Sequence, residues 1–164
     1  MKYVYNNELK KWEEETGEAG TDITLVRGLP GAGKTTYAEK MGRDVCVAAD
    51  DHFYDSAGQY NFDPKLLPDA HQSCQDKARN AMQAGKSVAV HNTFCERWEM
   101  EPYLAAAAAA GLTVEVVSVF DGGCTDEQLF KRNTHGVPLE TIEAMRERWE
   151  ENWQDGNPTP PWER

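Results

Sequence analysis

The sequence predicts an α/β fold in which a parallel sheet of about five strands carries helices on both faces. Short apolar runs alternate along the chain with stretches of helical character, and this alternation is typical of β-α-β units. Glycines follow two of the helical stretches, at Gly85 and Gly111, where helices commonly end. The length of 164 residues allows one domain with a hydrophobic core and leaves no room for a second full domain.

Four apolar runs are the expected strands. They cover residues 23–28, 45–50, 87–92 and 113–121. The expected helices cover residues 34–41, about 66–84, a segment that includes the alanine run 105–110, and residues 126–133 and 139–153. Residues 52–64 combine aromatic side chains with glycine and proline, which indicates a surface loop or a small hairpin.

These patterns divide the chain into three parts. Residues 1–20 are an N-terminal extension without an assigned role, residues 21–153 are the α/β domain, and residues 154–164 are a proline-rich tail of extended character. The last two expected helices are joined through residues 134–138 and form a helical hairpin at the end of the domain.

The cysteines and the hydropathy pattern indicate a cytoplasmic protein. Four cysteines lie far apart and lack the close spacing of a zinc site, so we expect reduced thiols. They are Cys46, Cys74, Cys95 and Cys124. No apolar run could serve as the core of a signal peptide or span a bilayer, and we therefore expect no membrane segment.

The formal net charge of -11 limits the kinds of partner that the protein can bind. Non-specific binding along nucleic acid depends on Lys and Arg side chains that neutralise phosphates, so we do not expect a long basic track. A local basic groove stays open as an alternative. The side chains that could converge to form it are Arg27, Lys34, Arg79, Arg97, Arg132, Arg146 and Arg148.

The segment GLPGAGKT at residues 28–35 has the pattern G-x-x-x-x-G-K-[ST] between an expected strand and an expected helix, which is the phosphate-binding loop of P-loop NTPases. Glycines let phosphate oxygens approach the backbone N–H groups closely. Lys34 can reach the β- and γ-phosphates of ATP, and the hydroxyl of Thr35 can hold Mg²⁺. The residues expected to contact ATP here are Gly28, Gly31, Ala32, Gly33, Lys34, Thr35 and Thr36.

Two acids end the second expected strand. Ligands of a parallel α/β sheet gather beyond the carboxyl ends of its strands, so Asp50 and Asp51 are expected on the same edge as the phosphate loop. A carboxylate at that position can accept the proton of an attacking hydroxyl. Two alternatives are a solvated turn or helix cap for either acid, and His52 as the base in place of Asp50.

Longer segments of the chain resemble the P-loop polynucleotide 5'-hydroxyl kinases, which include phage repair kinases and the kinase domain of some ubiquitin-ligase-binding proteins. The resemblance covers most of residues 23–150 in order and spacing. Besides the phosphate loop, it is carried by ADDHFY at 49–54, YNFDPKLLPDAHQSCQDKAR at 60–79, HNTFCERWEMEPY at 91–103 and RNTHGVPLETIEAMRERWE at 132–150.

This resemblance implies a role for individual residues. It places Lys34 and Thr35 at ATP and the metal, Asp50 as general base, and Arg132 in a helical lid over the phosphates, although a solvated helix arginine is an alternative for Arg132. The residues expected on the acceptor side are Asp50, His52, Phe53, His71 and Asn92. For His71, a buried and hydrogen-bonded core residue is an equal alternative. The aromatic residues of the 52–64 loop could stack a base or pack in the core.

The expected function is that of an ATP- and Mg²⁺-dependent kinase acting on a hydroxyl of a nucleic acid or nucleotide, with a polynucleotide 5'-hydroxyl as the leading acceptor. The chain departs from the resembled family on the acceptor side: HFY follows the acids where an arginine is common, His135 stands where a second arginine might stand, and His91 replaces an acid. A hydroxymethylated base in DNA, a nucleoside or a small alcohol stays open as acceptor. A nucleotide-binding switch or NTPase without an acceptor is a further alternative.

Overall fold

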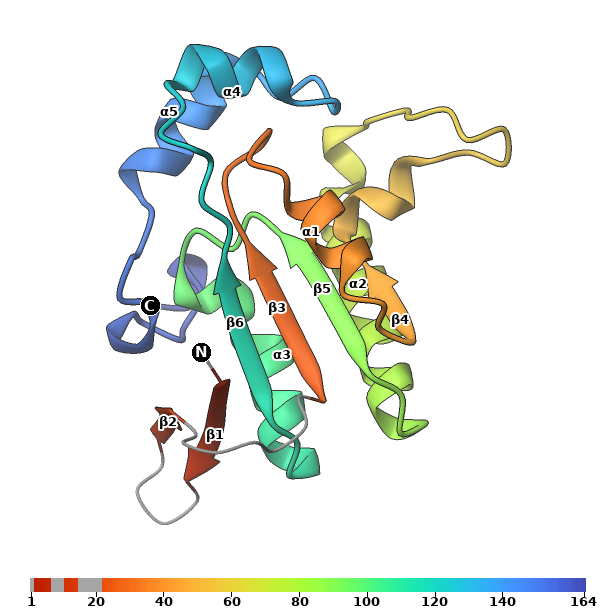
Figure 1. Ribbon diagram of the computed structural model, residues 1–164, viewed down its shortest axis with the longest axis vertical. Coiled ribbons are helices and arrows are strands. Elements are labelled where there is room, and N and C mark those ends of the chain that lie inside the picture. The colour runs from red at the N-terminus through yellow and green to blue at the C-terminus, as the bar shows by residue number, and fades with distance from the viewer. Residues whose placement is uncertain (1, 7–10, 15–21) are drawn as a thin grey trace.

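The computed structural model describes residues 2–6, 11–14 and 22–164 (Figure 1). Its sheet has six strands in the order β2-β1-β6-β3-β5-β4. The strands are β1 (Lys2–Asn6), β2 (Lys11–Glu14), β3 (Ile23–Arg27), β4 (Val45–Val47), β5 (Val88–Asn92) and β6 (Val114–Ser118). The helices are α1 (Lys34–Lys40), α2 (Leu67–Gln83), α3 (Arg97–Ala110), α4 (Asp126–Arg132) and α5 (Leu139–Glu147).

The predicted α/β fold is confirmed, with four parallel strands instead of about five. Strand β3 pairs in parallel with β5 and β6, and β4 pairs in parallel with β5. Two further strands are antiparallel: β1 pairs with β2, and β1 also pairs with β6 through Lys2 with Glu115 and Tyr3 with Val114. This hairpin falls in the predicted N-terminal extension, whose charged sequence lacks the apolar run by which the other strands were recognised. Residues 1, 7–10 and 15–21 of that extension lie outside the described part.

Helices cover both faces of the sheet, and the central strand β3 is therefore buried on both sides. Along β3, Ile23 and Leu25 face the core cluster formed with α2 and α3, whereas Val26 faces Ala38 of α1. All five residues of β3 are buried. Such continuous burial is what a parallel strand between two helical layers requires. The phosphate loop that follows β3 therefore starts from the centre of the core.

The last two helices lie beyond the carboxyl ends of the parallel strands, above the phosphate loop in Figure 1. They have a small core of their own, in which Leu129 and Ile142 pack on Leu29 of the loop. The helix predicted over residues 139–153 ends at Glu147. Beyond it the chain turns back, so that Trp153 enters the main core. Within the described residues, the structure contains no helix that is both long and apolar enough to span a membrane.

Candidate active site

The phosphate loop connects β3 to α1 by a turn in which the N–H of Ala32 donates to the carbonyl of Leu29 at 3.1 Å. Gly33 caps α1 with a φ of 100°, a left-handed conformation that favours glycine. Among the described residues, the backbone N–H groups of Gly33, Lys34 and Thr35 have no protein acceptor. Unsatisfied donors that face one turn fit the oxygen atoms of a bound phosphate, so the loop has the chemistry expected for ATP.

Lys34 lies over this loop. Its Nζ donates to the carbonyl of Leu29 at 3.1 Å. Burial lowers the pKa of Lys34 to about 8, and the nearby carboxylate of Asp50 opposes that shift. The influence of Asp50 on the pKa of Lys34 indicates that this carboxylate lies near the phosphate loop.

Thr35 lies at the first turn of α1 with its side chain exposed. Its Oγ1 is 3.4 Å from Nδ1 of His91, which lies near the end of β5. Burial lowers the pKa of His91, and Asp51 acts in the opposite direction, so the imidazole is neutral near pH 7. In the described part of the chain, no group of three or more His, Cys, Asp or Glu side chains could hold a metal ion. The hydroxyl of Thr35 fits a metal that is held mainly by phosphate oxygens and water.

The two acids occupy a 3-10 turn at Ala49–Phe53 and have different roles. Asp51 accepts a hydrogen bond from the N–H of Ala48 at 2.9 Å and so caps the turn. The carboxylate of Asp50 points toward His135 in the connection between α4 and α5, and 44% of its side chain is exposed. We call α4, this connection and α5 the lid. Asn92 supports this arrangement, because its Oδ1 accepts from the N–H of Ala49 at 2.9 Å. The structure thus assigns the cap to Asp51 and leaves Asp50 open to an acceptor.

Two side chains contact the carboxylate of Asp50 directly. The hydroxyl of Tyr60 donates to Oδ1 at 2.7 Å, and Nδ1 of His135 is 3.2 Å from Oδ2. Neither contact follows from the sequence, in which Tyr60 is one of several aromatic residues of the loop and His135 stands where the resembled family has an arginine. Their signal in the sequence is weak because both lie in irregular segments, whose path back to Asp50 no local pattern predicts.

Comparison with known proteins now places the chain. Residues 23–152 match the model of a family described as AAA domain. The chain belongs to this family. NEDD4-binding protein 2 of Homo sapiens is 35% identical over 147 residues, which cover 84% of this chain and 8% of that protein. The predicted membership of a P-loop polynucleotide kinase-like family is thereby confirmed.

Solved structures with the same fold as this AAA domain protein are more distant. One comes from the Pnkp1/Rnl/Hen1 RNA repair complex, with a TM-score of 0.60, 13% identity, and coverage of 88% of this chain and 51% of that chain. A second is a sugar kinase from Janibacter sp., with a TM-score of 0.54, 17% identity, and coverage of 88% and 90%. At these identities the likeness shows the fold, which is that of P-loop kinases.

The remaining candidates for the acceptor side of this AAA domain protein differ in how exposed they are. His52 is exposed beside the acids. His71 lies on α2 and is exposed. Partial desolvation of its imidazole lowers the pKa of His71, and the nearby carboxylate of Asp50 opposes that shift. Phe53 is buried in the core, where its ring packs against that of Tyr60 at 6.0 Å between centroids. This is the packing alternative for the aromatic residues of the loop, and it leaves the ring of Phe53 little surface for an acceptor.

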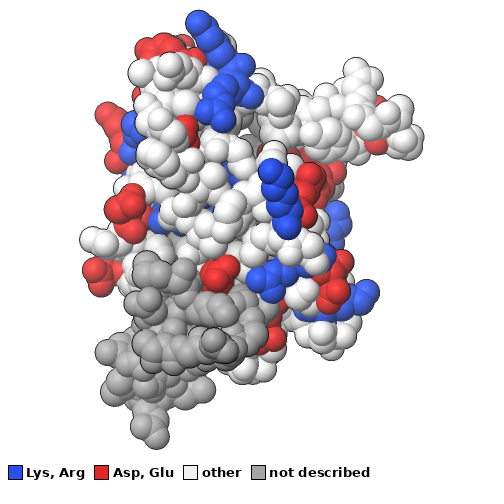
Figure 2. All heavy atoms as spheres, viewed as in Figure 1, with Lys and Arg blue, Asp and Glu red and all other residues white. Residues whose placement is uncertain are grey.

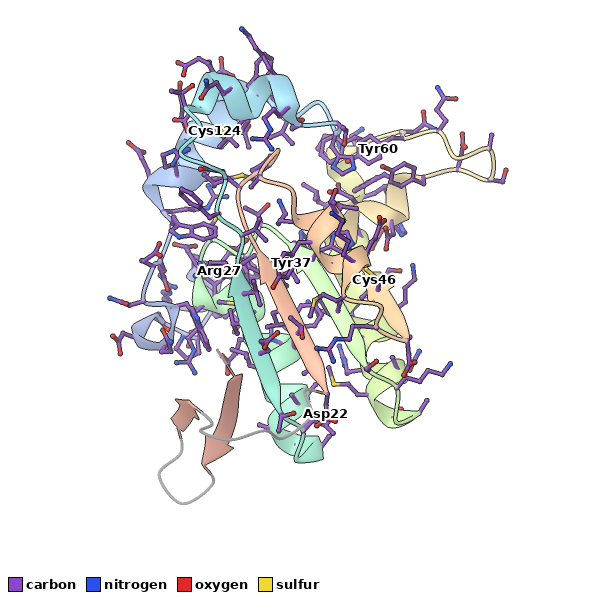
Figure 3. The ribbon with its side chains drawn as sticks, in the orientation of Figure 1. Asp22, Arg27, Tyr37, Cys46, Tyr60 and Cys124 are labelled. Atoms are coloured by element: carbon purple, nitrogen blue, oxygen red, sulfur yellow. The ribbon has the colours of Figure 1, made fainter. Side chains whose placement is uncertain are left out.

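Arg132 is the last residue of α4, and its side chain is exposed. Its guanidinium is 3.0 Å from Sγ of Cys124, which Figure 3 shows just before α4. The helix itself does reach the loop: a Cβ at Gly31 would lie 2.6 Å from the carbonyl oxygen of Leu129. The lid therefore packs on the phosphate loop, while the role predicted for Arg132 stays a prediction.

Several of the basic side chains considered for a groove have other partners among the described residues. On the face shown in Figure 2, Lys and Arg atoms are separated by acidic and uncharged surface. Arg27 is fully buried, with its three guanidinium nitrogens bonded to the carbonyls of Phe94, Cys95 and Glu150. Arg27 anchors the start of the phosphate loop and cannot contact a nucleic acid. It is therefore not part of the basic groove that the sequence left open. Arg79, Arg97 and Arg146 pair with neighbouring acids.

Proposed function

We propose that this protein is an ATP-dependent kinase that transfers the γ-phosphoryl group to an alcohol, with the 5'-hydroxyl of a polynucleotide as the leading acceptor. The observation that carries the proposal is the carboxylate of Asp50. It lies near Lys34 of the phosphate loop, it is accessible, and the structural capping role belongs to its neighbour Asp51. In an NTPase the same carboxylate would activate water, so transfer of the phosphoryl group to an alcohol is the observation that separates the two functions.

Each residue has a distinct part in the proposed reaction. Lys34 and the free N–H groups of the loop bind the phosphates, and the hydroxyl of Thr35 would hold Mg²⁺, which supplies charge neutralisation when it is bound. Asp50 accepts the proton while the acceptor oxygen bonds to the γ-phosphorus and the bond to the leaving oxygen of ADP breaks. Arg132 would stabilise the charge on the transferred group after rotation of its side chain.

The choice of a polynucleotide rests on the family resemblance of residues 49–54 and 60–79. A second acceptor class has a specific observation in its favour. The groups that contact Asp50 are Tyr60 and His135 and not an arginine, and a neutral alcohol such as a hydroxymethylated base or a small polyol needs no cation beside the base. Both acceptors would use the same proton transfer to Asp50.

The substitution Asp50→Asn tests the proposal, with Asp51→Asn as a matched control of equal charge change. Asp50→Asn keeps the shape and removes the proton acceptor, so ATP binding with Mg²⁺ should persist while transfer falls by about 10²- to 10⁴-fold. Asp51→Asn retains an oxygen that can cap Ala48 and should transfer phosphate at nearly the parent rate. Equal rates for the two variants would refute Asp50 as the base.

A screen with γ-labelled ATP identifies the acceptor class. The acceptors are 5'-hydroxyl DNA, 5'-hydroxyl RNA, DNA with hydroxymethylated bases, nucleosides and small polyols. We expect labelled product with a 5'-hydroxyl polynucleotide; transfer to hydroxymethylated DNA or to a polyol alone would select the second class. Phosphate release that no acceptor stimulates would show an NTPase.

A further inference from the structure

Both carboxylate oxygens of Asp50 are engaged by residues from two different segments. Tyr60, which donates to Oδ1 at 2.7 Å, closes the loop that begins at Tyr54, and an isolated bridge pairs these two residues. His135, which lies 3.2 Å from Oδ2, belongs to the connection between α4 and α5. In Figure 3, Tyr60 lies where the loop after β4 faces the lid. The lid and the loop therefore meet at Asp50.

The contacts continue beyond the carboxylate. Nε2 of His135 is 3.1 Å from the hydroxyl of Tyr54, and the ring of His135 lies 4.6 Å from the ring of Tyr60. With a proton on Nδ1, His135 donates to Asp50 and its Nε2 accepts from Tyr54. All polar atoms of the four side chains then have compatible donor and acceptor roles.

This arrangement fixes the carboxylate without blocking it. A carboxylate offers about four lone-pair positions, and Tyr60 and His135 use one on each oxygen. Rotation of the carboxylate would break both contacts. Because 44% of the side chain stays exposed, a hydroxyl can reach a remaining lone pair of Asp50 from a defined direction.

We propose that Tyr60 and His135 are positioning residues that orient the carboxylate of Asp50 toward the acceptor hydroxyl, so that the lid completes the acceptor side of the site. This inference rests on the kinase function proposed above. Tyr60 remains a hydrogen-bond donor, because burial and then the bond to Asp50 raise its pKa well above the ordinary value. Defined orientation of a general base is worth a large rate factor in enzymes.

Groups from every neighbouring element act on the same carboxylate and must stay unchanged in a test. Removal of a single hydroxyl meets this requirement, since it leaves all charged side chains in place. The titratable groups around Asp50 are Lys34 from α1, Asp51 from the same turn, His71 from α2, His91 from β5, Tyr54 and Tyr60 from the loop and His135 from the lid.

Tyr60→Phe is the test variant and Tyr54→Phe its matched control. Both remove one hydroxyl from the same loop, but only Tyr60 contacts Asp50. With a 5'-hydroxyl oligodeoxynucleotide and γ-labelled ATP, we expect Tyr60→Phe to lower kcat about 10-fold with little change in the KM for ATP. The acidic limb of its kcat profile should move to higher pH, because a donor to the charged carboxylate is lost. Tyr54→Phe should change both much less.

Combination with Asp50→Asn separates this inference from the proposed function. If Tyr60 acts through Asp50, Tyr60→Phe adds no further loss to the Asp50→Asn variant. Parent-like turnover of Asp50→Asn would refute the proposed function itself. Two results would overturn the positioning role alone. One is that Tyr60→Phe slows the Asp50→Asn variant by the same factor as it slows the parent. The other is that Tyr54→Phe loses as much activity as Tyr60→Phe.

A measurement without turnover gives an independent result. The ¹³C signal of the Asp50 side-chain carboxyl is followed by NMR over a pH titration of the parent and of the three single variants Tyr60→Phe, His135→Ala and Tyr54→Phe. The titration curve should move to higher pH in Tyr60→Phe and His135→Ala and should stay in place in Tyr54→Phe. Superimposable curves for the parent and Tyr60→Phe would overturn the inference whichever alcohol the enzyme phosphorylates.

Discussion

Gly31→Ala should destabilise the protein through a contact between the phosphate loop and the lid. The φ of Gly31 is 80°, and a Cβ there would lie 2.6 Å from the carbonyl oxygen of Leu129 and 3.2 Å from the N–H nitrogen of Asn133. The left-handed backbone costs a non-glycine residue roughly 1–2 kcal/mol. Relief of the backbone clash costs about 1–3 kcal/mol more, as in other overpacked sites. We expect a total loss of about 2–5 kcal/mol, a large part of the ~5–15 kcal/mol typical of a domain.

Gly33→Ala is the matched control, two residues away in the same loop. Its φ is 100°, but a Cβ at Gly33 meets no atom within 4 Å. Backbone strain alone predicts a loss of about 1–2 kcal/mol. Urea denaturation of both variants measures the difference, provided that the m values agree. Equal losses for Gly31→Ala and Gly33→Ala would refute a tight contact between the phosphate loop and α4.

Lys34→Ala should abolish phosphoryl transfer and leave the unfolding transition in place, because it removes charge from the phosphates and nothing from the core; normal turnover at saturating ATP would contradict this. Arg132→Ala should lower kcat more than it raises the KM for ATP, in agreement with a role in the transition state; a change confined to the acceptor KM would move Arg132 to the acceptor side. Burial raises the pKa of Glu99, so its charged form is disfavoured in the folded state and costs stability at neutral pH. Glu99→Gln, which can still accept from the N–H of Glu96, should therefore be more stable than the parent at pH 7 in chemical denaturation, and the gain should vanish below the ordinary pKa of glutamate; a gain that persists at low pH would contradict this sign.

The sequence predicts best those elements whose apolar runs and glycines lie within a single segment. The phosphate loop, the four parallel strands and helices α1 and α2 depend on apolar runs and glycine positions that a single segment contains. The hairpin of β1 and β2 was missed because its short, charged sequence gains its strand structure from pairing with β6. The burial of Arg27 could not be predicted for a related reason: the three backbone carbonyls that bind it come from two distant segments. Such partners exist only after the chain has folded.

Contacts between distant segments also limit how much of the acceptor side the sequence predicts. Asp50 could be chosen from its place at a strand end, whereas Tyr60 and His135 could not, because the loop and the lid that carry them come together only in the folded protein.

The two halves of the site are held by different kinds of contact, and this bears on how the acceptor could change within one fold. The nucleotide half is set in the core: Arg27 is fully buried next to the phosphate loop, and the N–H of Gly28 donates to the carbonyl of Thr93. The acceptor half depends on hydrogen bonds of Tyr60 and His135, which are only partly buried. Substitutions at fully buried anchors commonly cost more folding stability than substitutions at partly buried positions. In the proposed kinase, the loop and the lid connection could therefore change with the acceptor while the phosphate loop and Asp50 keep the same chemistry.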